Sequence, residues 1–511
     1  MKYLKTIVYL LMAGILGYSC QKDNNSYLQE KETITIEGIN DTYNSIADKD
    51  ILEISPEVKS TYSEPEFEYT WTVYPANVTG EIPKVDTISN TLNLNYKVEL
   101  LARKYNLVFS TKNKKTGLTA YRNVELVVNT EYTRGWYVLK DDGKDSDLDQ
   151  FFTVNSIIPS NAKNEDIFSR LNGYKILGKG LRLTFLSDYK STLVSSTPSN
   201  TRTLFVGTEN EISAIYINNL REYRNKNSLF FSSPMEIKNG VVFQGNGGQY
   251  IINNNHLFGI STAVLNSGIF GSSAMRDDYN SPYELSPYFL TSNVTPTLLY
   301  DNKSSTFLSA AYAPEVLSTV NNKNGESIGK NQYCNYMGLQ KKVYDAKNYV
   351  MILQGPGIFE NTLTGEKSLI QMEFDSDGLT FTKSVIPLSL MLYNAKNYTV
   401  LAESENLLYY SNGGNVYSYG LTSKLEQLQY TLPAGEEVTF IRHRKYSESG
   451  YEFDYVMIGS KAGNNYRIRM FEKLGGNLKS VPAFSLEGKG EAKDVIYISP
   501  SVSSQTFPNS Y

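Results

Sequence analysis

Hydrophobic and polar residues alternate along many short stretches of this chain. In Leu407 to Leu421 (LLYYSNGGNVYSYGL), two such runs lie on either side of Gly413-Gly414. Alternation with a period of two predicts a β-strand, because successive side chains of a strand point to opposite faces. A Gly-Gly pair between two alternating runs predicts a tight turn, so this stretch is expected to form a β-hairpin.

Similar strand–turn–strand units recur from about residue 135 onward. They read LFVGTENEISAIYI, GVVFQGNGGQYII, SLIQMEFDSDGLTF and RIRMFEKLGGNLKS. The 365 residues from Gly135 to Pro500 allow seven or eight four-stranded blades at about 45–50 residues per blade. We therefore predict a β-propeller-like domain over residues 131–511, with a stack of β-sandwich modules as the alternative architecture.

The preceding segment, residues 32–130, predicts a small PKD/Ig-like β-sandwich. Its short alternating runs are Thr33–Glu37, Asp50–Ile54, Phe67–Tyr74, Thr91–Tyr96, Tyr105–Thr111 and Tyr121–Val128. Several short strands separated by turn residues are typical of such a sandwich. In FEYTWTVYP, Trp71 shares a face with the other large side chains, so we expect it in the core. The whole chain is therefore predicted to be all-β.

The N-terminus predicts an export signal with a lipid anchor. Lys2 and Lys5 precede an apolar run, Ile7–Leu16, which is too short to span a bilayer. The Gly-Tyr-Ser-Cys that follows resembles a bacterial lipobox, which implies removal of residues 1–19, acylation of Cys20 and a lipidated tether over residues 20–31. An ordinary secretory signal is the alternative. The expected location is the outer membrane, facing the cell exterior, with the periplasmic face as the second possibility.

Charge and composition exclude several classes of function. The net charge is −4 and no basic stripe is present, which argues against nucleic-acid binding. The chain has two cysteines and two histidines, too few for a structural zinc site of the Cys/His type once Cys20 carries lipid. Cys334 is then the only free thiol and is expected to be a buried apolar residue. We expect no cofactor.

Motifs for catalysis or metal binding are weak. His443 lies between Arg442 and Arg444 in an alternating run, which predicts a solvated strand face more than a catalytic base. The acids of Asp145–Asp149 resemble the start of a calcium loop, but Gln150 stands where that loop needs glycine. A charged hairpin turn is the favoured interpretation, so we expect no metal site and no catalytic residue.

The best candidate for ligand binding is the loop MRDDYNSPYELSPYF, which combines tyrosines with acids and prolines. Tyr279, Tyr283 and Tyr288 are the candidate ligand-binding residues, because exposed tyrosine stacks on sugar rings or holds peptide backbones. The alternative is a long connection between blades with its tyrosines packed on the propeller surface.

Three stretches together resemble a known family: YTWTVYP, TISNTLNLNY and KYNLVFSTKNKKTGLTAYRNVELVV, with YVLKDDGKDSDLDQFF continuing the match. They are similar to the PKD-like module of Bacteroidetes surface lipoproteins, although the Gly-Asp-Gly turn of ordinary PKD domains is missing. The resemblance implies a non-enzymatic accessory subunit of a SusC/SusD-like, TonB-dependent nutrient importer. Its expected partners are that transporter, other surface lipoproteins and an oligopeptide or glycan ligand.

Two alternatives to this function make different structural predictions. A propeller hydrolase acting on surface polymers predicts a cluster of acids, or of arginines with a tyrosine, in the central channel. An adhesin or structural lipoprotein predicts no concave aromatic site.

Overall fold

The computed structural model describes residues 32–47, 49–76, 82–154, 161–232, 236–448 and 451–507. Two compact units divide the chain, residues 1–129 and residues 130–511. The predicted signal peptide (1–19), Cys20 and the predicted tether (20–31) lie outside the described residues. Within the described ranges, no helix has the length and apolar character needed to cross a membrane.

The first unit is a β-sandwich. One face is a five-stranded sheet in the order β2-β9-β8-β5-β6, and two further pairs are β1-β4 and β3-β7. The strands are β1 (Ile34–Glu37), β2 (Thr42–Ile46), β3 (Ile51–Ile54), β4 (Glu57–Ser60), β5 (Phe67–Pro75), β6 (Asp86–Ser89), β7 (Leu94–Lys97), β8 (Lys104–Asn113) and β9 (Thr119–Asn129).

Trp71 lies at the centre of this sandwich, as predicted. Its side chain is fully buried, its indole N–H donates to the Leu92 carbonyl at 3.2 Å, and its ring lies 4.6 Å from that of Phe109. A buried indole with its N–H satisfied contributes apolar area without an unpaired donor. Trp71 is therefore a core residue of the first unit.

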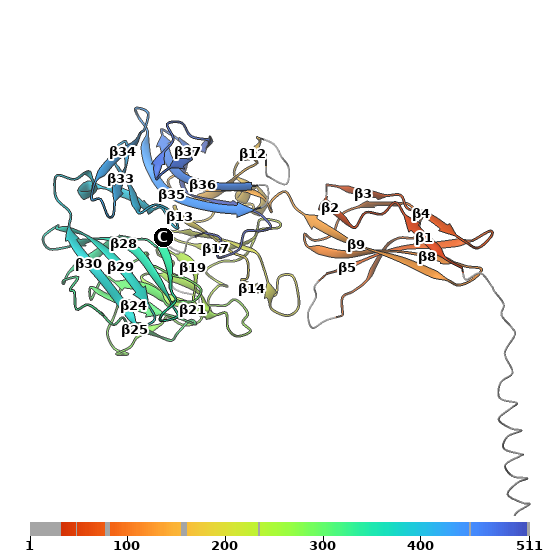
Figure 1. The fold of residues 1–511 in the computed structure, drawn as a ribbon, viewed down its shortest axis with the longest axis horizontal. Coiled ribbons are helices and arrows are strands. Elements are labelled where there is room, and N and C mark those ends of the chain that lie inside the picture. The colour runs from red at the N-terminus through yellow and green to blue at the C-terminus, as the bar shows by residue number, and fades with distance from the viewer. Residues whose placement is uncertain are drawn as a thin grey trace, which may run out of the picture. The chain divides into compact units, whose positions relative to one another are not determined.

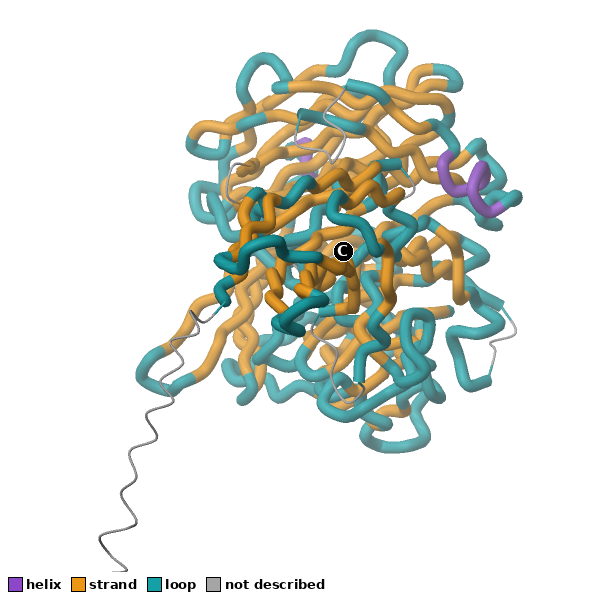
Figure 2. The backbone as a smooth tube through the Cα atoms, turned by 90° about the vertical axis from the view of Figure 1, so that its right-hand side faces the viewer, coloured by secondary structure: helices purple, strands orange, loops and turns teal. Residues whose placement is uncertain are grey.

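The second unit is a seven-bladed β-propeller, because its strands form seven radial sheets around one centre (Figure 1). Strands and loops make up almost all of it, with only short helical segments (Figure 2). The helical segments are α2 (Ile167–Asn172) and the 3₁₀ turn η1 (Met391–Asn394). Inner strands of neighbouring blades contact one another between blades 1 and 2, 2 and 3, 6 and 7, and 7 and 1.

The first four blades carry the following strands. Blade 1 has β41 (Glu491–Ile498), β10 (Gly135–Asp141), β11 (Ser146–Phe151) and β12 (Lys163–Asn164). Blade 2 has β13 (Gly180–Leu186), β16 (Thr203–Thr208), β17 (Ile212–Tyr216) and β18 (Arg221–Arg224), with the side ribbon β14 (Lys190–Ser191) and β15 (Ser199–Asn200). Blade 3 has β19 (Val241–Gly245), β20 (Gly248–Asn253) and β21 (His256–Ser261). Blade 4 has β23 (Thr297–Asp301), β24 (Thr306–Ala310), β25 (Val316–Thr319) and β22 (Met275–Arg276).

The other three blades complete the circle. Blade 5 has β26 (Gln332–Met337), β27 (Lys341–Asp345), β28 (Val350–Asn361), β29 (Lys367–Asp375) and β30 (Gly378–Val385). Blade 6 has β31 (Lys396–Val400), β32 (Leu407–Asn412), β33 (Asn415–Gly420) and β34 (Glu426–Thr431). Blade 7 has β35 (Glu437–Glu448), β36 (Tyr451–Ala462), β37 (Asn465–Phe471) and β40 (Phe484–Lys489), with the ribbon β38 (Lys473–Leu474) and β39 (Asn477–Leu478).

The hairpin predicted at Gly413-Gly414 is the centre of blade 6. Strands β32 and β33 pair in antiparallel register, and Gly413 has φ +59° in the turn. That region of φ is easily reached by glycine and rarely by other residues, which explains the choice of residue. The buried residues of each blade pack against the neighbouring blade, so the core of this unit is a ring of contacts between blades.

Blade 1 closes the ring with strands from both ends of the second unit. Gly135 pairs with Ile498, and the register continues to Asp141 opposite Glu491. The inner strand β41 therefore adds to three strands that come from the beginning of the unit. Such closure removes the exposed sheet edge that an open arrangement would leave.

Candidate functional site

A groove opens between blades 5 and 6 because their strands differ in length. Strand β28 has 12 residues and β29 has 9, whereas β31 of blade 6 has 5. Ile358 and Leu369, which pair across β28 and β29, pack against the apolar side chains of blade 6. Further along the same face of blade 5, these apolar residues give way to polar ones.

The polar part of this face follows from the strand register. Pro356 pairs with Gln371, and Gln371 pairs with Thr382 on the next strand. One step further, Gln354 pairs with Glu373, which pairs with Thr380. Residues two apart on a strand share a face, so these side chains line one surface next to the residues that pack against blade 6.

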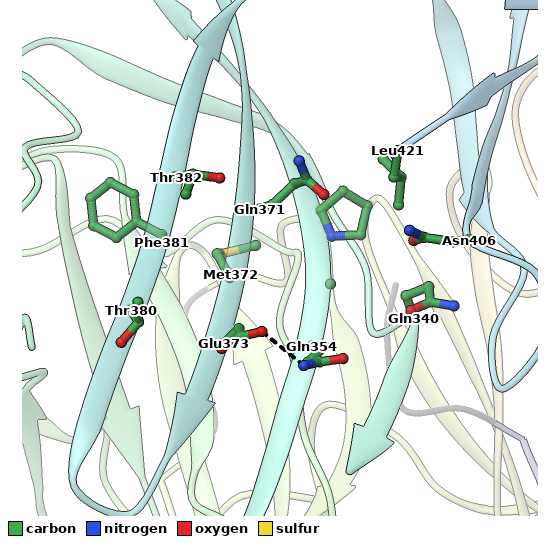
Figure 3. A pocket seen from close by; sticks show the side chains of 12 residues that line it. Gln340, Gln354, Gln371, Met372, Glu373, Thr380, Phe381, Thr382, Asn406 and Leu421 are labelled. Carbon is green, nitrogen blue, oxygen red and sulfur yellow. Dashed lines mark hydrogen bonds between the residues drawn. The ribbon is translucent and has the colours of Figure 1, made fainter. Parts of the chain in front are cut away.

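We call this surface the carboxamide groove; it has a volume of about 420 Å³. Its lining residues are Gln340, Gln354, Gly355, Pro356, Gln371, Met372, Glu373, Thr380, Phe381, Thr382, Asn406 and Leu421. Figure 3 shows Gln354, Gln371 and Glu373 on the strands of blade 5, with Gln340, Asn406 and Leu421 across the opening.

Hydrogen bonds fix some of these side chains. Gln354 Nε2 donates to Glu373 Oε1 at 2.9 Å (Figure 3). Gln340 Nε2 donates to the Ser404 carbonyl at 3.3 Å, and Asn406 Nδ2 donates to Thr422 Oγ1 at 2.7 Å.

Gln371 differs from these three carboxamides. Its side chain is half-buried and forms no hydrogen bond within the described part of the chain. An amide with two donor hydrogens and an acceptor oxygen left over is therefore available to a ligand.

The chemistry of the groove suits a neutral, polar ligand. Carboxamides donate and accept hydrogen bonds, and threonine hydroxyls do the same. Glu373 is the single charged residue among those that line the groove, and Met372, Phe381 and Leu421 add apolar atoms to its wall. A concave site with several convergent polar groups over apolar walls is typical of a small-ligand site.

The three candidate tyrosines do not form one binding surface. Tyr279 is 64% exposed, whereas Tyr283 is 4% exposed. The Tyr283 hydroxyl donates to the Ala274 carbonyl at 2.5 Å and accepts from the Leu257 N–H at 3.3 Å. Tyr288 is half-buried, with its ring 5.5 Å from that of Tyr336. Of the three candidates, only Tyr279 has the exposed ring that the ligand-binding prediction assumes, while Tyr283 and the half-buried Tyr288 pack against other residues of the propeller.

His443 is buried, which corrects the expectation of a solvated strand face. Its ring is only 4% exposed, and Nε2 lies 2.7 Å from Asp454 Oδ1. Lys473 pairs with Asp454 at 3.0 Å and with Glu405 at 2.9 Å. These residues join β35, β36 and β38 of blade 7 to the loop after β31 of blade 6. The set is a structural ion-pair network between two blades.

The pKa shifts in this network follow from burial and pairing. Burial lowers the pKa of His443, and the neighbouring Asp454 offsets this only in part. For Asp454, burial alone would raise the pKa, but hydrogen bonds from His443 and Lys473 lower it to about 2.

The acids of the calcium-like loop have separate partners. Asp145 accepts from the Gly178 N–H at 3.2 Å, Asp147 from the Ser169 N–H at 3.1 Å, and Asp149 pairs with Lys140 at 2.8 Å. In the part of the chain that the structure describes, no group of three or more His, Cys, Asp or Glu side chains is placed to hold a metal ion. The segment forms the β10–β11 hairpin.

Arginines and a tyrosine come near one another in the propeller, a pattern that the hydrolase alternative predicts for its central channel. Arg442 Nε pairs with Asp494 at 3.2 Å, and Asp494 also accepts from the Leu183 N–H at 2.9 Å. The Tyr336 hydroxyl accepts from the Val400 N–H at 3.0 Å. Arg442 and Tyr336 are thus engaged within the fold, whereas Arg444 forms no ion pair with a described carboxylate and its Nε atom lacks an acceptor.

Cys334 is buried, as predicted. Burial raises the pKa of its thiol to about 12. A thiol of this kind is chemically inert at neutral pH.

The sequence contained one sign of the carboxamide groove. In SLIQMEFDSDGLTF the alternation places Ile370, Met372 and Phe374 on one face, and all three are buried. The opposite face of the same strand carries Gln371 and Glu373. Whether a polar face meets solvent or another blade depends on the length of the neighbouring strands, which alternation does not report.

Comparison with known proteins finds one family model that matches part of the chain. The model of the PKD-like family matches residues 20–180, which cover the sandwich and the beginning of blade 1. The chain thus carries a PKD-like region followed by a propeller. A search of the curated proteins finds no match.

Solved structures similar to this chain are distant. A quinonprotein alcohol dehydrogenase-like protein from Bacteroides thetaiotaomicron shares 13% identity, with a TM-score of 0.39, over 89% of this chain and 96% of that one. The WD40 domain of SCAP from fission yeast shares 7% identity, with a TM-score of 0.35, over 71% and 91%. At these values the similarity carries no information on activity or ligand.

Proposed function

We propose that this protein is a lipid-anchored outer-membrane protein facing the cell exterior. In this proposal it is a non-enzymatic accessory subunit of a SusC/SusD-like, TonB-dependent importer and captures an oligopeptide or a glycan. The PKD-like match over residues 20–180 and the lipobox-like sequence that ends at Cys20 support the family and the anchor. An anchored binder raises the local concentration of nutrient beside the transporter, so that transfer becomes nearly intramolecular.

The carboxamide groove is the observation that carries the binding role. It offers the free amide of Gln371 and the hydroxyls of Thr380 and Thr382 on one rigid sheet face. These groups match the hydroxyls of a glycan or the amides of a peptide backbone, and they hold little charge. We therefore expect a neutral ligand in either case.

Removal of the carboxamides tests this role. Gln354→Ala with Gln371→Ala should weaken binding of the ligand found on a glycan array or in a neutral peptide pool. Each lost hydrogen bond contributes about 0.5–1.5 kcal/mol, so the double change should weaken binding about 5-fold to 150-fold. The matched control is Gln427→Ala, an exposed carboxamide on β34 of blade 6. Equal binding by the groove variant and the control would show that the ligand binds elsewhere.

The anchor and the partner need separate experiments. Cys20→Ala should release the protein from membranes, and retention of that variant would contradict the anchor. Purification of the native protein from detergent-solubilised outer membranes should recover a SusC/SusD-like transporter. Recovery without such a partner would favour an adhesin or structural lipoprotein, and cleavage of a polymer by the pure protein would favour the hydrolase.

A further inference from the structure

A small cavity lies inside the propeller, next to the inner strands of blades 2, 3 and 7. Its volume is about 40 Å³, and Arg182, Gln244, Phe289, Arg444 and Phe507 are among the residues that line it. We call it the Arg444 cavity. It is separate from the carboxamide groove, with which it shares no lining residue.

Arg444 has no anionic partner in this cavity. Its side chain is 6% exposed, and its guanidinium lies over the Phe507 ring at 5.0 Å from the centroid. The Nε atom is buried and lacks a hydrogen-bond acceptor. Among the described residues, no carboxylate forms an ion pair with Arg444. Burial lowers its pKa, because desolvation disfavours the charged form.

The carboxylates near this cavity are engaged by other groups. Asp494 is fully buried and pairs with Arg442, while it also accepts from the backbone N–H groups of Leu183 and Val495. Asp188 accepts from the amides of Gln244 and Gln249 and from Ser504.

Arg182 adds a second guanidinium to the wall, 5.8 Å from the centre of the Phe289 ring. The guanidinium groups of Arg182 and Arg444 therefore both line this cavity, and no carboxylate is among its lining residues.

Burying an arginine without an anion raises the free energy of the folded protein, and binding of an anion from solution would offset that cost. The planar guanidinium fork is complementary to a carboxylate. The volume also fits, because about 10–15 Å³ of such space holds one water-sized group, and a carboxylate has three heavy atoms. We propose that the Arg444 cavity binds the carboxylate group of a small acid or of a peptide C-terminus.

Phe507 separates the cavity from a larger hollow of about 590 Å³. Both spaces are lined by Phe507, and the larger one is also lined by Lys342 and Lys445. Rotation of the Phe507 ring away from Arg444 would join the two spaces. The route would then pass Lys445 and the ion pair of Lys342 with Glu403, whose atoms lie 3.2 Å apart. The inference does not depend on the proposed function, since it needs neither the anchor nor the carboxamide groove.

The proposal can be tested on the purified protein with sodium acetate. The neutral control is acetamide in sodium chloride of the same ionic strength. Acetate should raise the melting temperature in a saturable manner, and acetamide should not. Arg444→Gln should weaken acetate binding at least about tenfold, since hydrogen bonds to charged groups are strong. Arg467→Gln on β37 of blade 7, an arginine whose side chain is 42% exposed, is the control and should bind like the native protein. Equal effects of acetate and acetamide would overturn the proposal.

A second measurement keeps the test valid if Arg444→Gln does not fold. In Phe507→Ala, phenylglyoxal should modify Arg444, as read by peptide mass spectrometry, and acetate should protect it. Modification that acetate does not slow would overturn the proposal. A short neutral peptide with a free C-terminus, compared with its C-terminal amide, then distinguishes the two sources of the carboxylate. Stronger protection by the free peptide than by acetate indicates a peptide ligand, and protection by acetate alone indicates a small acid.

Discussion

The contact between blades 5 and 6 that ends at the carboxamide groove depends on one buried hydroxyl. Tyr336 is 2% exposed, and its hydroxyl accepts from the N–H of Val400, which is itself 3% exposed. Tyr336→Phe keeps the ring and removes the acceptor. A buried N–H left without a partner costs about 1–3 kcal/mol, so the free energy of unfolding should fall by that amount.

The expected fall in the free energy of unfolding can be converted into a change in melting temperature from the number of residues in the second unit. Residues 130–511 number 382. At about 2.1 cal/mol/K per residue, the unfolding entropy is about 0.8 kcal/mol/K, and each kcal/mol corresponds to about 1.2 °C. Tyr336→Phe should therefore lower the melting temperature by about 1–4 °C in a calorimetric scan.

Tyr419→Phe is the matched control. Tyr419 belongs to the same apolar cluster and is 6% exposed, but its hydroxyl forms no hydrogen bond within the described ranges. That substitution should change stability by less than about 0.5 kcal/mol. An equal loss in both variants would show that packing of the ring, and not the bond to Val400, joins the blades. No loss in Tyr336→Phe would refute the reasoning altogether.

Two further predictions concern buried titratable groups. Burial raises the pKa of the Cys334 thiol to about 12, so this thiol should not react with a thiol reagent in the native protein. It should react after the protein is unfolded in denaturant. Fast labelling of the native protein would contradict the burial of Cys334. The pKa of His443 is lowered from 6.5 by burial, so the unfolded chain takes up the proton first as the pH falls. The second unit should accordingly keep its full stability above about pH 6.5 and lose some as the pH falls below that value. His443→Gln should remove that part of the pH dependence in thermal melts. A slope unchanged in His443→Gln would assign the pH dependence to other groups.

Alternation and turn residues predicted the strands of this protein well. The hairpin at Gly413-Gly414, the buried face of Ile370, Met372 and Phe374, and the core position of Trp71 are all present. Each depends on neighbours within one sheet or one hairpin, which local sequence specifies. Seven radial sheets likewise agree with a repeat of about 45–50 residues.

Alternation and turn residues did not predict where the candidate site residues lie, because those positions depend on contacts between blades. His443 alternates like a surface residue, yet Asp454 and Lys473 of its own blade and Glu405 of the next enclose it. Tyr283 lies in a polar loop, yet its ring packs in the apolar cluster between blades 3 and 4. The groove is lined by residues of blades 5 and 6, and the relation between two blades is not contained in any single stretch of sequence.

The pairing of β10 with β41 has a consequence for biogenesis. Asp141 and Glu491 lie opposite each other, although 350 residues separate them along the chain. During synthesis, β10 is complete long before β41, so one flank of β10 has no neighbouring strand until the end of the chain has been made. A fragment that stops short of residue 491 lacks β41, so blade 1 keeps an exposed strand edge and the ring of blades stays open.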